Sequence, residues 1–277
     1  MSANHQAAFM SSHPSYRIGI FDSGLGGLSV RAALRQRLPQ ASLLYVADSG
    51  FAPYGNKSAA EVRERSLHIA HFLLTQQVDA LVIACNTATA AAATALRAEL
   101  SLPVIAMEPG LKPAIAASKN GIIAVLATQG TLASQQFLHL RERYATGVKV
   151  IDLPCPGWVQ LVENGEYDSP AARAQVSATL APARAAGADT LVLGCTHFPF
   201  LRAAIQAAMP TARLVETAAA VAEQTARRLS GITPGQLPQE MRYWSSGDIQ
   251  HGSSLMAQLA GEALQLEALP QNGLASA

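Results

Sequence analysis

The most constraining feature of the sequence is an internal repeat, in which two apolar segments of one pattern each end in a cysteine. Residues 78–85 read VDALVIAC and residues 188–195 read ADTLVLGC, so an aspartate precedes each cysteine by six residues. A short, continuous apolar run is typical of a strand buried on both faces of a parallel sheet. The repeat therefore predicts two related halves, each with a thiol at the carboxyl end of a strand.

Apolar strands alternate with helical patterns along the rest of the chain. This alternation favours an α/β fold with parallel sheets and right-handed crossovers. Two pseudo-symmetric lobes that face each other would place Cys85 and Cys195 on opposite sides of one cleft. The expected strands are 17–21, 43–47, 80–84, 103–106, 121–127, 148–153, 191–193, 213–215 and 241–245, and the expected helices include 58–77, 87–100, 131–144, 170–186 and 199–208.

The composition excludes several classes of protein. Hydrophobic residues make up 49% of the 277 residues and charged residues 14%, which is typical of a chain with a large core. The net charge of +1 indicates no nucleic-acid or membrane partner. Residues 1–15 lack the pattern of a secretory signal, so we expect a cytoplasmic protein with a flexible tail over 1–16 and reduced cysteines. No cysteine pair has the spacing of a zinc or redox site, and we expect no metal.

Both repeated cysteines are candidates for chemistry. Cys85 begins an Ala-rich helix, where the helix dipole and free N–H groups are expected to lower the pKa of a thiol. A small, buried structural cysteine is the alternative for this position. Cys195 is followed by Thr196 and His197, and the imidazole could polarise the thiol or bind a substrate carboxylate.

Other candidates lie at the loops that follow the predicted strands. Asp22 and Ser23 end the first strand, where Asp22 could deprotonate a thiol, bind a substrate ammonium or cap the next helix. The glycine-rich run 24–27 is not a GxGxxG motif, so we expect no dinucleotide site. The remaining candidates are the turn Pro53-Tyr54-Gly55, the pair Thr128 and Thr131 with helix capping as the alternative, Glu163 as a pocket-edge or exposed carboxylate, and Cys155 as a structural cysteine.

Two thiols suit one reaction class in particular. Inversion of an α-amino acid removes the Cα proton from one face and returns a proton to the other. Two acid/base groups across a cleft can do this, with one as thiolate and the other as thiol. A non-catalytic amino-acid binder is the alternative from another class, but such binders are usually exported.

With these residues in place, the chain resembles the glutamate racemase family. The similar motifs run in family order: DSGLGG (22–27), PYG (53–55), CNTA (85–88), 128–131, Cys155-Pro156, LVE (161–163) and GCTHFP (194–199). The resemblance implies two flavodoxin-like lobes, the first from 17–108 plus 217–277 and the second from 109–216. It also implies a homodimeric enzyme that needs no cofactor.

The resemblance further implies conversion of L-glutamate to D-glutamate for peptidoglycan. Cys85 would handle the proton of D-glutamate with help from Asp22, and Cys195 that of L-glutamate with help from His197. The implied substrate-binding residues are Asp22, Ser23, Tyr54, Gly55, Asn86, Thr87, Thr196 and His197. To these we add the loop neighbours Pro53, Thr128 and Thr131. An aspartate racemase or a related enzyme is the alternative, and a single-thiol decarboxylase fits less well. Some relatives bind DNA gyrase, but no feature of this sequence indicates that surface.

Overall fold

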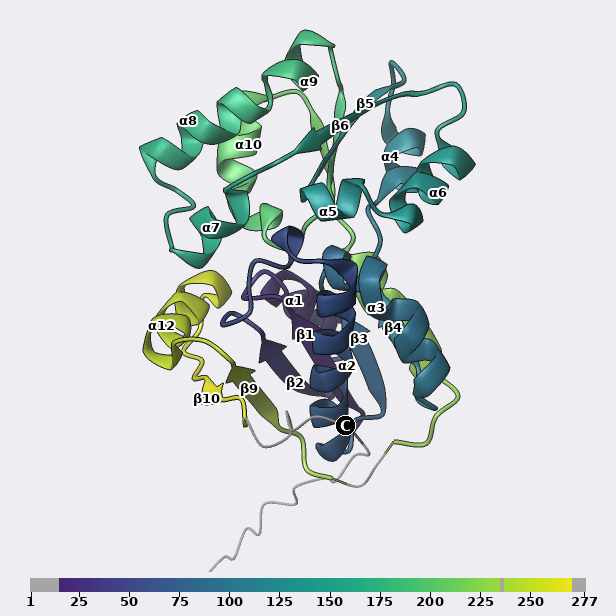
Figure 1. Cartoon of the computed structure of the whole chain (residues 1–277), viewed down its shortest axis with the longest axis vertical. Helices are drawn as coiled ribbons and strands as arrows, with labels where there is room; N and C mark the ends of the chain where they lie inside the picture. The colour runs from purple at the N-terminus through teal and green to yellow at the C-terminus, as the bar shows by residue number, and fades with distance from the viewer. Residues whose placement is uncertain (1–14, 235–236, 271–277) are drawn as a thin grey trace, which may run out of the picture.

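The computed structural model describes residues 15–234 and 237–270, and these residues form two parallel sheets stacked end to end as two lobes (Figure 1). The first sheet has the order β10-β9-β2-β1-β3-β4 and the second has the order β6-β5-β7-β8. All strand pairs are parallel. The strands are β1 (Arg17–Asp22), β2 (Ser42–Ala47), β3 (Ala80–Ile83), β4 (Val104–Ala106), β5 (Ile122–Ala127), β6 (Lys149–Pro154), β7 (Thr190–Leu193), β8 (Arg213–Val215), β9 (Met241–Ser245) and β10 (Glu267–Ala268).

The strands β2-β1-β3-β4 of the first sheet and the four strands of the second sheet have the same order, which confirms the predicted α/β fold with two similar lobes. The central strand β1 lies between β2 and β3, and β5 lies in the same way between β6 and β7. Strands β3 and β7, which carry the sequence repeat, are therefore equivalent in the two lobes. The flexible tail was predicted over residues 1–16, of which 1–14 lie outside the described residues. Ser15 is buried, and the Tyr16 hydroxyl donates to two carbonyl groups near the end of α11 (Ala218–Leu229), so these two residues pack against the first lobe.

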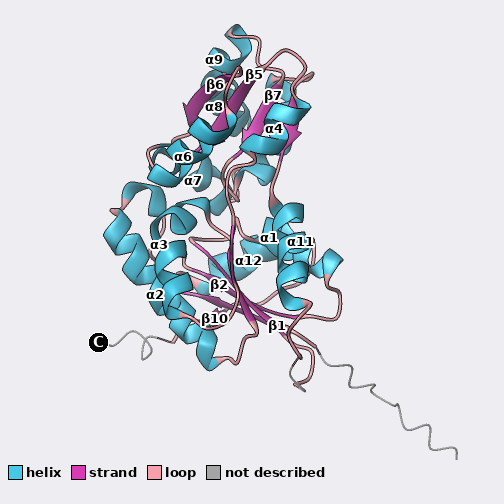
Figure 2. Ribbon diagram, turned by 90° about the vertical axis from the view of Figure 1, so that its right-hand side faces the viewer, coloured by secondary structure: helices cyan, strands magenta, loops and turns pink. Residues whose placement is uncertain are grey.

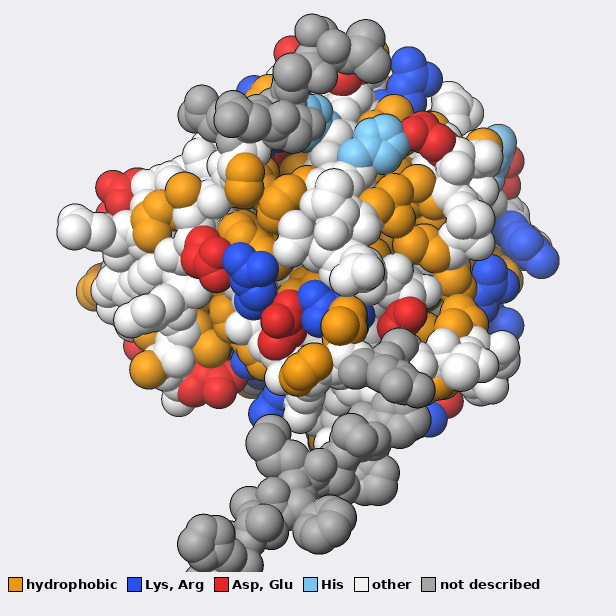
Figure 3. All heavy atoms as spheres, turned by 90° about the horizontal axis from the view of Figure 1, so that it is seen from below, with side chains coloured by type: hydrophobic (Ala, Val, Ile, Leu, Met, Phe, Trp, Pro, Cys, Tyr) orange, Lys and Arg blue, Asp and Glu red, His pale blue; other side chains and the backbone are white. Residues whose placement is uncertain are grey.

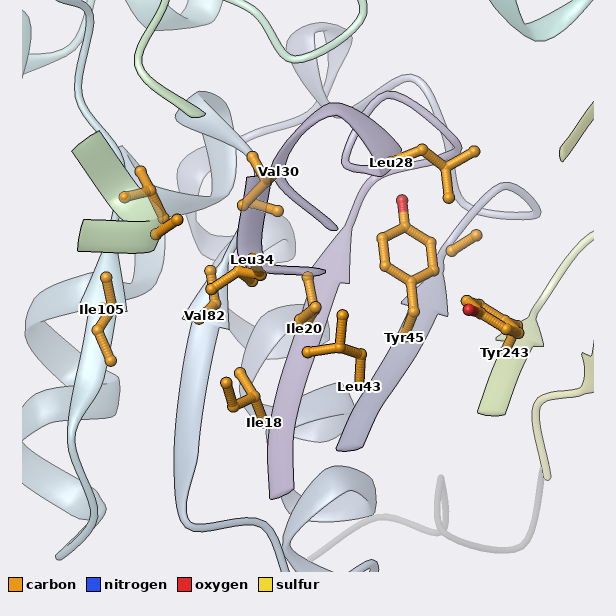
Figure 4. Close-up of a cluster of buried hydrophobic side chains, with 14 of the residues drawn as sticks. Ile18, Ile20, Leu28, Val30, Leu34, Leu43, Tyr45, Val82, Ile105 and Tyr243 are labelled. Atoms are coloured by element: carbon orange, nitrogen blue, oxygen red, sulfur yellow. The ribbon is translucent and has the colours of Figure 1, made fainter. Parts of the chain in front are cut away.

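Helices cover both faces of each sheet (Figure 2). On one face of the first sheet, Ile18, Ile20, Leu43 and Val82 pack with side chains of α1 (Leu28–Arg37), including Leu34 (Figure 4). The helices are α1 (Leu28–Arg37), α2 (Ala59–Thr75), α3 (Asn86–Glu99), α4 (Leu111–Ala117), α5 (Gln129–Leu132), α6 (Gln135–Tyr144), α7 (Trp158–Glu163), α8 (Pro170–Thr179), α9 (Ala181–Ala185), α10 (Arg202–Ala208), α11 (Ala218–Leu229) and α12 (Ile249–Ala260), with 3-10 turns η1 (Tyr54–Asn56) and η2 (Phe198–Leu201).

Three predicted helices are each divided in the structure, and the one expected over 199–208 becomes the 3-10 turn η2 followed by α10. The helix expected over 131–144 becomes α5 and α6, because the Ser134 side chain accepts a hydrogen bond from the Phe137 N–H and starts a new helix there. The helix expected over 170–186 becomes α8 and α9, with Pro182 in the first turn of α9. Proline lacks the N–H that an uninterrupted helix would need at this point.

Among residues 15–234 and 237–270, no helix has the length and apolar character required to cross a membrane. On the described part of the face at the far end of the first lobe, acidic and basic side chains lie next to one another with hydrophobic side chains between them (Figure 3). This mixture agrees with a net charge close to zero.

Candidate active site

The two repeated cysteines lie at equivalent strand ends, and the lobes meet at those ends. Cys85 follows β3 and is the N-cap residue of α3, whereas Cys195 follows β7 and precedes η2. Both are buried. The aspartates of the repeat lie at the opposite, amino ends of the strands, where Asp79 accepts from the Arg17 N–H and Asp189 from the Lys119 N–H. These aspartates are structural, and the thiols are the part of the repeat that faces the cleft.

Burial, rather than the helix start, decides the acidity of Cys85. Its Sγ accepts from the Ala88 N–H at 3.4 Å and lies 3.7 Å from the Ser23 hydroxyl. Burial and the nearby Asp22 carboxylate raise the pKa of the Cys85 thiol to about 12, against the lowering effect of the Ala88 N–H. The expectation of a lowered pKa was therefore wrong for this arrangement, because loss of solvation outweighs one backbone donor.

Asp22 is fully buried at the end of β1, and both of its carboxylate oxygens are used. Oδ2 accepts from the N–H groups of Gly24 and Gly27 at 3.2 and 3.0 Å, and Oδ1 accepts from the Thr196 hydroxyl of the other lobe at 3.2 Å. Gly27 is the N-cap residue of α1, so the interpretation of Asp22 or Ser23 as the cap residue was wrong, although Asp22 does bind the cap N–H. Burial raises the pKa of Asp22 to about 6, with His197 opposing this shift.

His197 joins the second thiol to Glu163. Its Nδ1 lies 3.7 Å from the Cys195 Sγ, and its Nε2 lies 2.6 Å from Oε1 of Glu163. Burial alone would lower the pKa of His197, but the hydrogen bonds to Cys195 and Glu163 raise it well above the ordinary value. Burial would likewise raise the pKa of Glu163, and the hydrogen bond from His197 lowers it. The pair therefore favours an imidazolium beside Cys195.

The glycine-rich loop of the first lobe lies directly against this pair. The Leu25 N–H donates to Oε1 of Glu163 at 2.6 Å, and the Gly26 N–H lies 3.2 Å from His197 Nε2. A Cβ atom on Gly24 would lie 2.3 Å from Oε1 of Glu163, and one on Gly26 would lie 2.3 Å from Nδ1 of His197. The lobes are thus closed on each other at this loop, and the approach of the His197 ring leaves no room for a side chain at Gly26. Glu163 lies at this contact between the lobes, and its role as a pocket-edge carboxylate stays a prediction.

A cluster of hydroxyl groups also joins the lobes on the Cys85 side. The Thr87 hydroxyl lies 3.0 Å from that of Thr128 and 3.3 Å from that of Thr131. Thr128 also caps α5 by accepting from the Thr131 N–H, which confirms the capping interpretation, and its role in substrate binding stays a prediction.

Asn86, next to this cluster, is the clearest sign of a polar ligand. Its side-chain amide is buried, and neither Nδ2 nor Oδ1 has a hydrogen-bond partner among the described residues. A buried amide without partners is costly, and a ligand that supplies them would remove the cost. The cavity between Asn86 and Thr131 has a volume of about 10 Å³, which is no larger than one water molecule needs. A larger ligand at this position requires the lobes to separate.

The Pro53-Tyr54-Gly55 turn meets the second lobe through Gly55. A Cβ atom on Gly55 would lie 3.2 Å from the Cβ of Thr128. The Tyr54 hydroxyl does not point to this cluster but donates to Asp48 at 2.8 Å. Asp48 was not among the predicted site residues, although it directly follows β2 and Asp22 is the last residue of β1, and this similar position at the carboxyl end of a strand was the available signal.

The third cysteine is part of the second-lobe core. Cys155 is buried with Trp158 and Phe198, and its Sγ lies 3.3 Å from the Leu153 carbonyl oxygen. Burial raises the pKa of its thiol. These contacts support the structural interpretation. Within the described part of the chain, no group of three or more His, Cys, Asp or Glu side chains is arranged to hold a metal ion.

Comparison with known proteins gives consistent relatives. A family model described as Asp/Glu/Hydantoin racemase matches residues 28–225. The chain is 50% identical over 253 residues to a glutamate racemase of Ectopseudomonas mendocina, covering 90% of this chain and 96% of that one.

Two solved structures share the fold over nearly their whole length. A glutamate racemase isoform of Bacillus anthracis has a TM-score of 0.84 at 33% identity, with 93% of this chain and 98% of that chain covered. The Escherichia coli glutamate racemase, solved in complex with L-glutamate and the activator UDP-MurNAc-Ala, has a TM-score of 0.85 at 32% identity, with coverage of 92% and 98%.

Proposed function

The chain belongs to the Asp/Glu/Hydantoin racemase family, and we propose that it is a glutamate racemase that uses Cys85 and Cys195 as its two acid/base groups. The observation that carries this proposal is the equivalence of the two thiols. Each follows the same strand of its own lobe, at the edge where the lobes meet. Glutamate is favoured over aspartate because the relative at 50% identity, like both structural neighbours, is a glutamate racemase.

The proposed reaction moves one proton on each face of the substrate. One cysteine, as thiolate, removes the Cα proton, and the other, as thiol, donates a proton to the opposite face. The enzyme then holds the protons in the reverse arrangement and is ready for the other enantiomer. Cys85 serves the proton of D-glutamate and Cys195 that of L-glutamate. Closed lobes exclude water from the carbanion-like transition state and strengthen the interactions that stabilise it.

The two thiols have different partners for this task. His197, held by Glu163, places positive charge beside Cys195, with its Nδ1 3.7 Å from the Sγ. Cys85 has Asp22 and Ser23 instead, and its raised pKa calls for a positive charge nearby. A substrate ammonium group bound by Asp22 would supply that charge. Asn86, Thr87, Thr128 and Thr131 offer donors for a substrate carboxylate.

The product D-glutamate would serve peptidoglycan synthesis. The Escherichia coli neighbour was solved with UDP-MurNAc-Ala as its activator, which supports a link to cell-wall chemistry for such enzymes. A cytoplasmic homodimer that needs no cofactor stays a prediction, and light scattering of the purified chain tests the oligomeric state.

Circular dichroism decay of L-glutamate and of D-glutamate, with no added cofactor, tests the proposal. Wild type should racemise both enantiomers, whereas Cys85→Ser and Cys195→Ser should each lose interconversion. Cys155→Ser is the matched control, since it removes a thiol that is buried in the second-lobe core with Trp158 and Phe198, and it should keep activity. Full activity in either of the first two variants would exclude the two-thiol mechanism.

Solvent deuterium separates two bases from one. In D2O, two bases require the product enantiomer to carry deuterium at Cα from its first appearance, while unreacted substrate keeps protium. Retention of the substrate proton in the product would point to a single base. If the wild type racemises aspartate but not glutamate, the proposed two-thiol chemistry stands and the proposed substrate is wrong.

A further inference from the structure

A second buried carboxylate, Asp48, lies at the carboxyl end of β2, next to the site but outside the proposed chemistry. Arg65 of α2 binds it through two hydrogen bonds, from Nε to Oδ2 at 2.8 Å and from Nη2 to Oδ1 at 2.5 Å. The Asp48 side chain is fully buried and the Arg65 side chain is only 16% exposed. A bidentate pair of this kind is strong and fixes orientation as well as distance.

The same carboxylate holds Tyr54. The Tyr54 hydroxyl donates to Oδ2 of Asp48 at 2.8 Å, and Ser246, after β9, donates to Oδ1 at 2.7 Å. The Phe51 ring meets the Tyr54 ring edge-on with centroids 5.9 Å apart, and the Arg65 guanidinium lies 5.6 Å from the centroid of Phe51. Arg65 therefore contacts both groups that fix the position of Tyr54.

Tyr54 in turn sets the position of Gly55, the residue of this turn that meets the second lobe. Gly55 follows Tyr54 in η1 and lies against Thr128, whose hydroxyl contacts Thr87. Because the Tyr54 hydroxyl is committed to Asp48, the turn faces the cleft with the backbone at Gly55. A shift of Tyr54 would move this backbone relative to the hydroxyl cluster.

We propose that Arg65 is a positioning residue for racemisation. Through Asp48 and Phe51 it fixes Tyr54, and it thereby fixes the Gly55 backbone beside the hydroxyl groups that bind a substrate carboxylate. This inference rests on the proposed function. Arg65 itself contacts no reacting atom and acts on substrate binding rather than on proton transfer.

The test compares Arg65→Ala with Arg17→Ala. Arg17 also forms a largely buried ion pair in the first lobe, 2.6 Å from Glu240, but at the amino end of β1, away from the cleft. We expect Arg65→Ala to raise KM for both glutamate enantiomers about tenfold, with kcat changed less than threefold. Arg17→Ala should lower Tm with KM unchanged.

Chemical complementation gives a readout that general destabilisation would not move. Arg65 borders a surface pocket of about 520 Å³, which can admit a guanidinium ion. Millimolar guanidinium chloride should lower the KM of Arg65→Ala toward the wild-type value and should leave Arg17→Ala unaffected. If Arg65→Ala does not fold, Arg65→Lys keeps the charge without the bidentate geometry, and its KM should rise about threefold.

A double-mutant cycle tests the route through Tyr54. In a Tyr54→Phe background, Arg65→Ala should raise KM by less than threefold, because the contact it supports is already lost. The assignment would be overturned if the Arg65→Ala and Tyr54→Phe substitutions raised KM by factors that multiply in the double variant. It would also be overturned by an unchanged KM in the Arg65 variants, or by an equal rise of KM in Arg17→Ala. If the wild type racemises glutamate and any of these outcomes occurs, only this inference is refuted. If the wild type is inactive, the proposed function is refuted and this inference with it.

Discussion

Gly26→Ala probes whether the closed contact between the lobes is the one used in catalysis. A Cβ atom at this position would lie 2.3 Å from Nδ1 of His197 and 2.6 Å from Cε1. Ordinary contacts begin near 3.4 Å, so the shortfall is about 1.1 Å. The imidazole is only 1% exposed and is held by both Cys195 and Glu163, so it cannot rotate aside. The backbone at Gly26 is not left-handed, so alanine causes no local strain.

The lobes or the imidazole must therefore move by about 1 Å, and such a misplacement can reduce a rate about 100-fold. This factor corresponds to about 2.7 kcal/mol in activation free energy. We expect kcat/KM for glutamate to fall by that factor in a circular dichroism assay, with little change in Tm because the lobes can separate as bodies.

Two other glycines calibrate this result. Gly24→Ala should have a smaller effect, because its Cβ meets the end of the flexible Glu163 side chain. Gly231→Ala is the control, since no atom of residues 15–234 or 237–270 outside its own surroundings lies within 4 Å of its Cβ position. If Gly26→Ala kept kcat/KM within threefold of wild type, the closed contact would not be the catalytic one.

Two further predictions concern stability. Asp22 has a folded-state pKa of about 6 against 3.8 without burial, so its contribution to stability is full below about pH 4 and is lost as pH rises through 6. Asp22→Asn should therefore be more stable than wild type at pH 7.5, on the order of 1–3 kcal/mol, and about equal at pH 4, as measured by urea unfolding; the same difference at both pH values would refute this. Ser58→Ala removes the capping box with Glu61 at the start of α2 and should lower Tm by about 2–4 °C. Ser58→Thr should keep most of the stabilisation by the cap. An unchanged Tm in the alanine variant would refute the role of the cap.

The positions of the thiols were predictable because they follow from strand order. An apolar run that ends in a polar junction places the next residue at the carboxyl edge of a parallel sheet, and the repeat placed Cys85 and Cys195 in equivalent strands. The partners of these thiols across the cleft were not predictable in this way. The link between Glu163, His197 and Leu25 depends on how the lobes meet, which no local pattern encodes.

The acidity of Cys85 shows the same limit. Its place at a helix start was predicted, but the depth of burial there depends on packing around both lobes. Two short elements, α4 and β10, were also not predicted. The helix α4 contains Pro113, and the strand β10 has only two residues. Such segments carry too little periodicity to be recognised from sequence.

The order of the strands has a consequence for synthesis on the ribosome. The second sheet is built from one continuous stretch, residues 122–215, whereas β2 of the first sheet pairs on one side with β9, which begins at Met241. The N-terminal half emerges first but leaves an edge strand uncovered until nearly the whole chain has been translated. We expect the later sheet to close before the earlier one is complete, so that the last segment to leave the ribosome finishes the half that was made first.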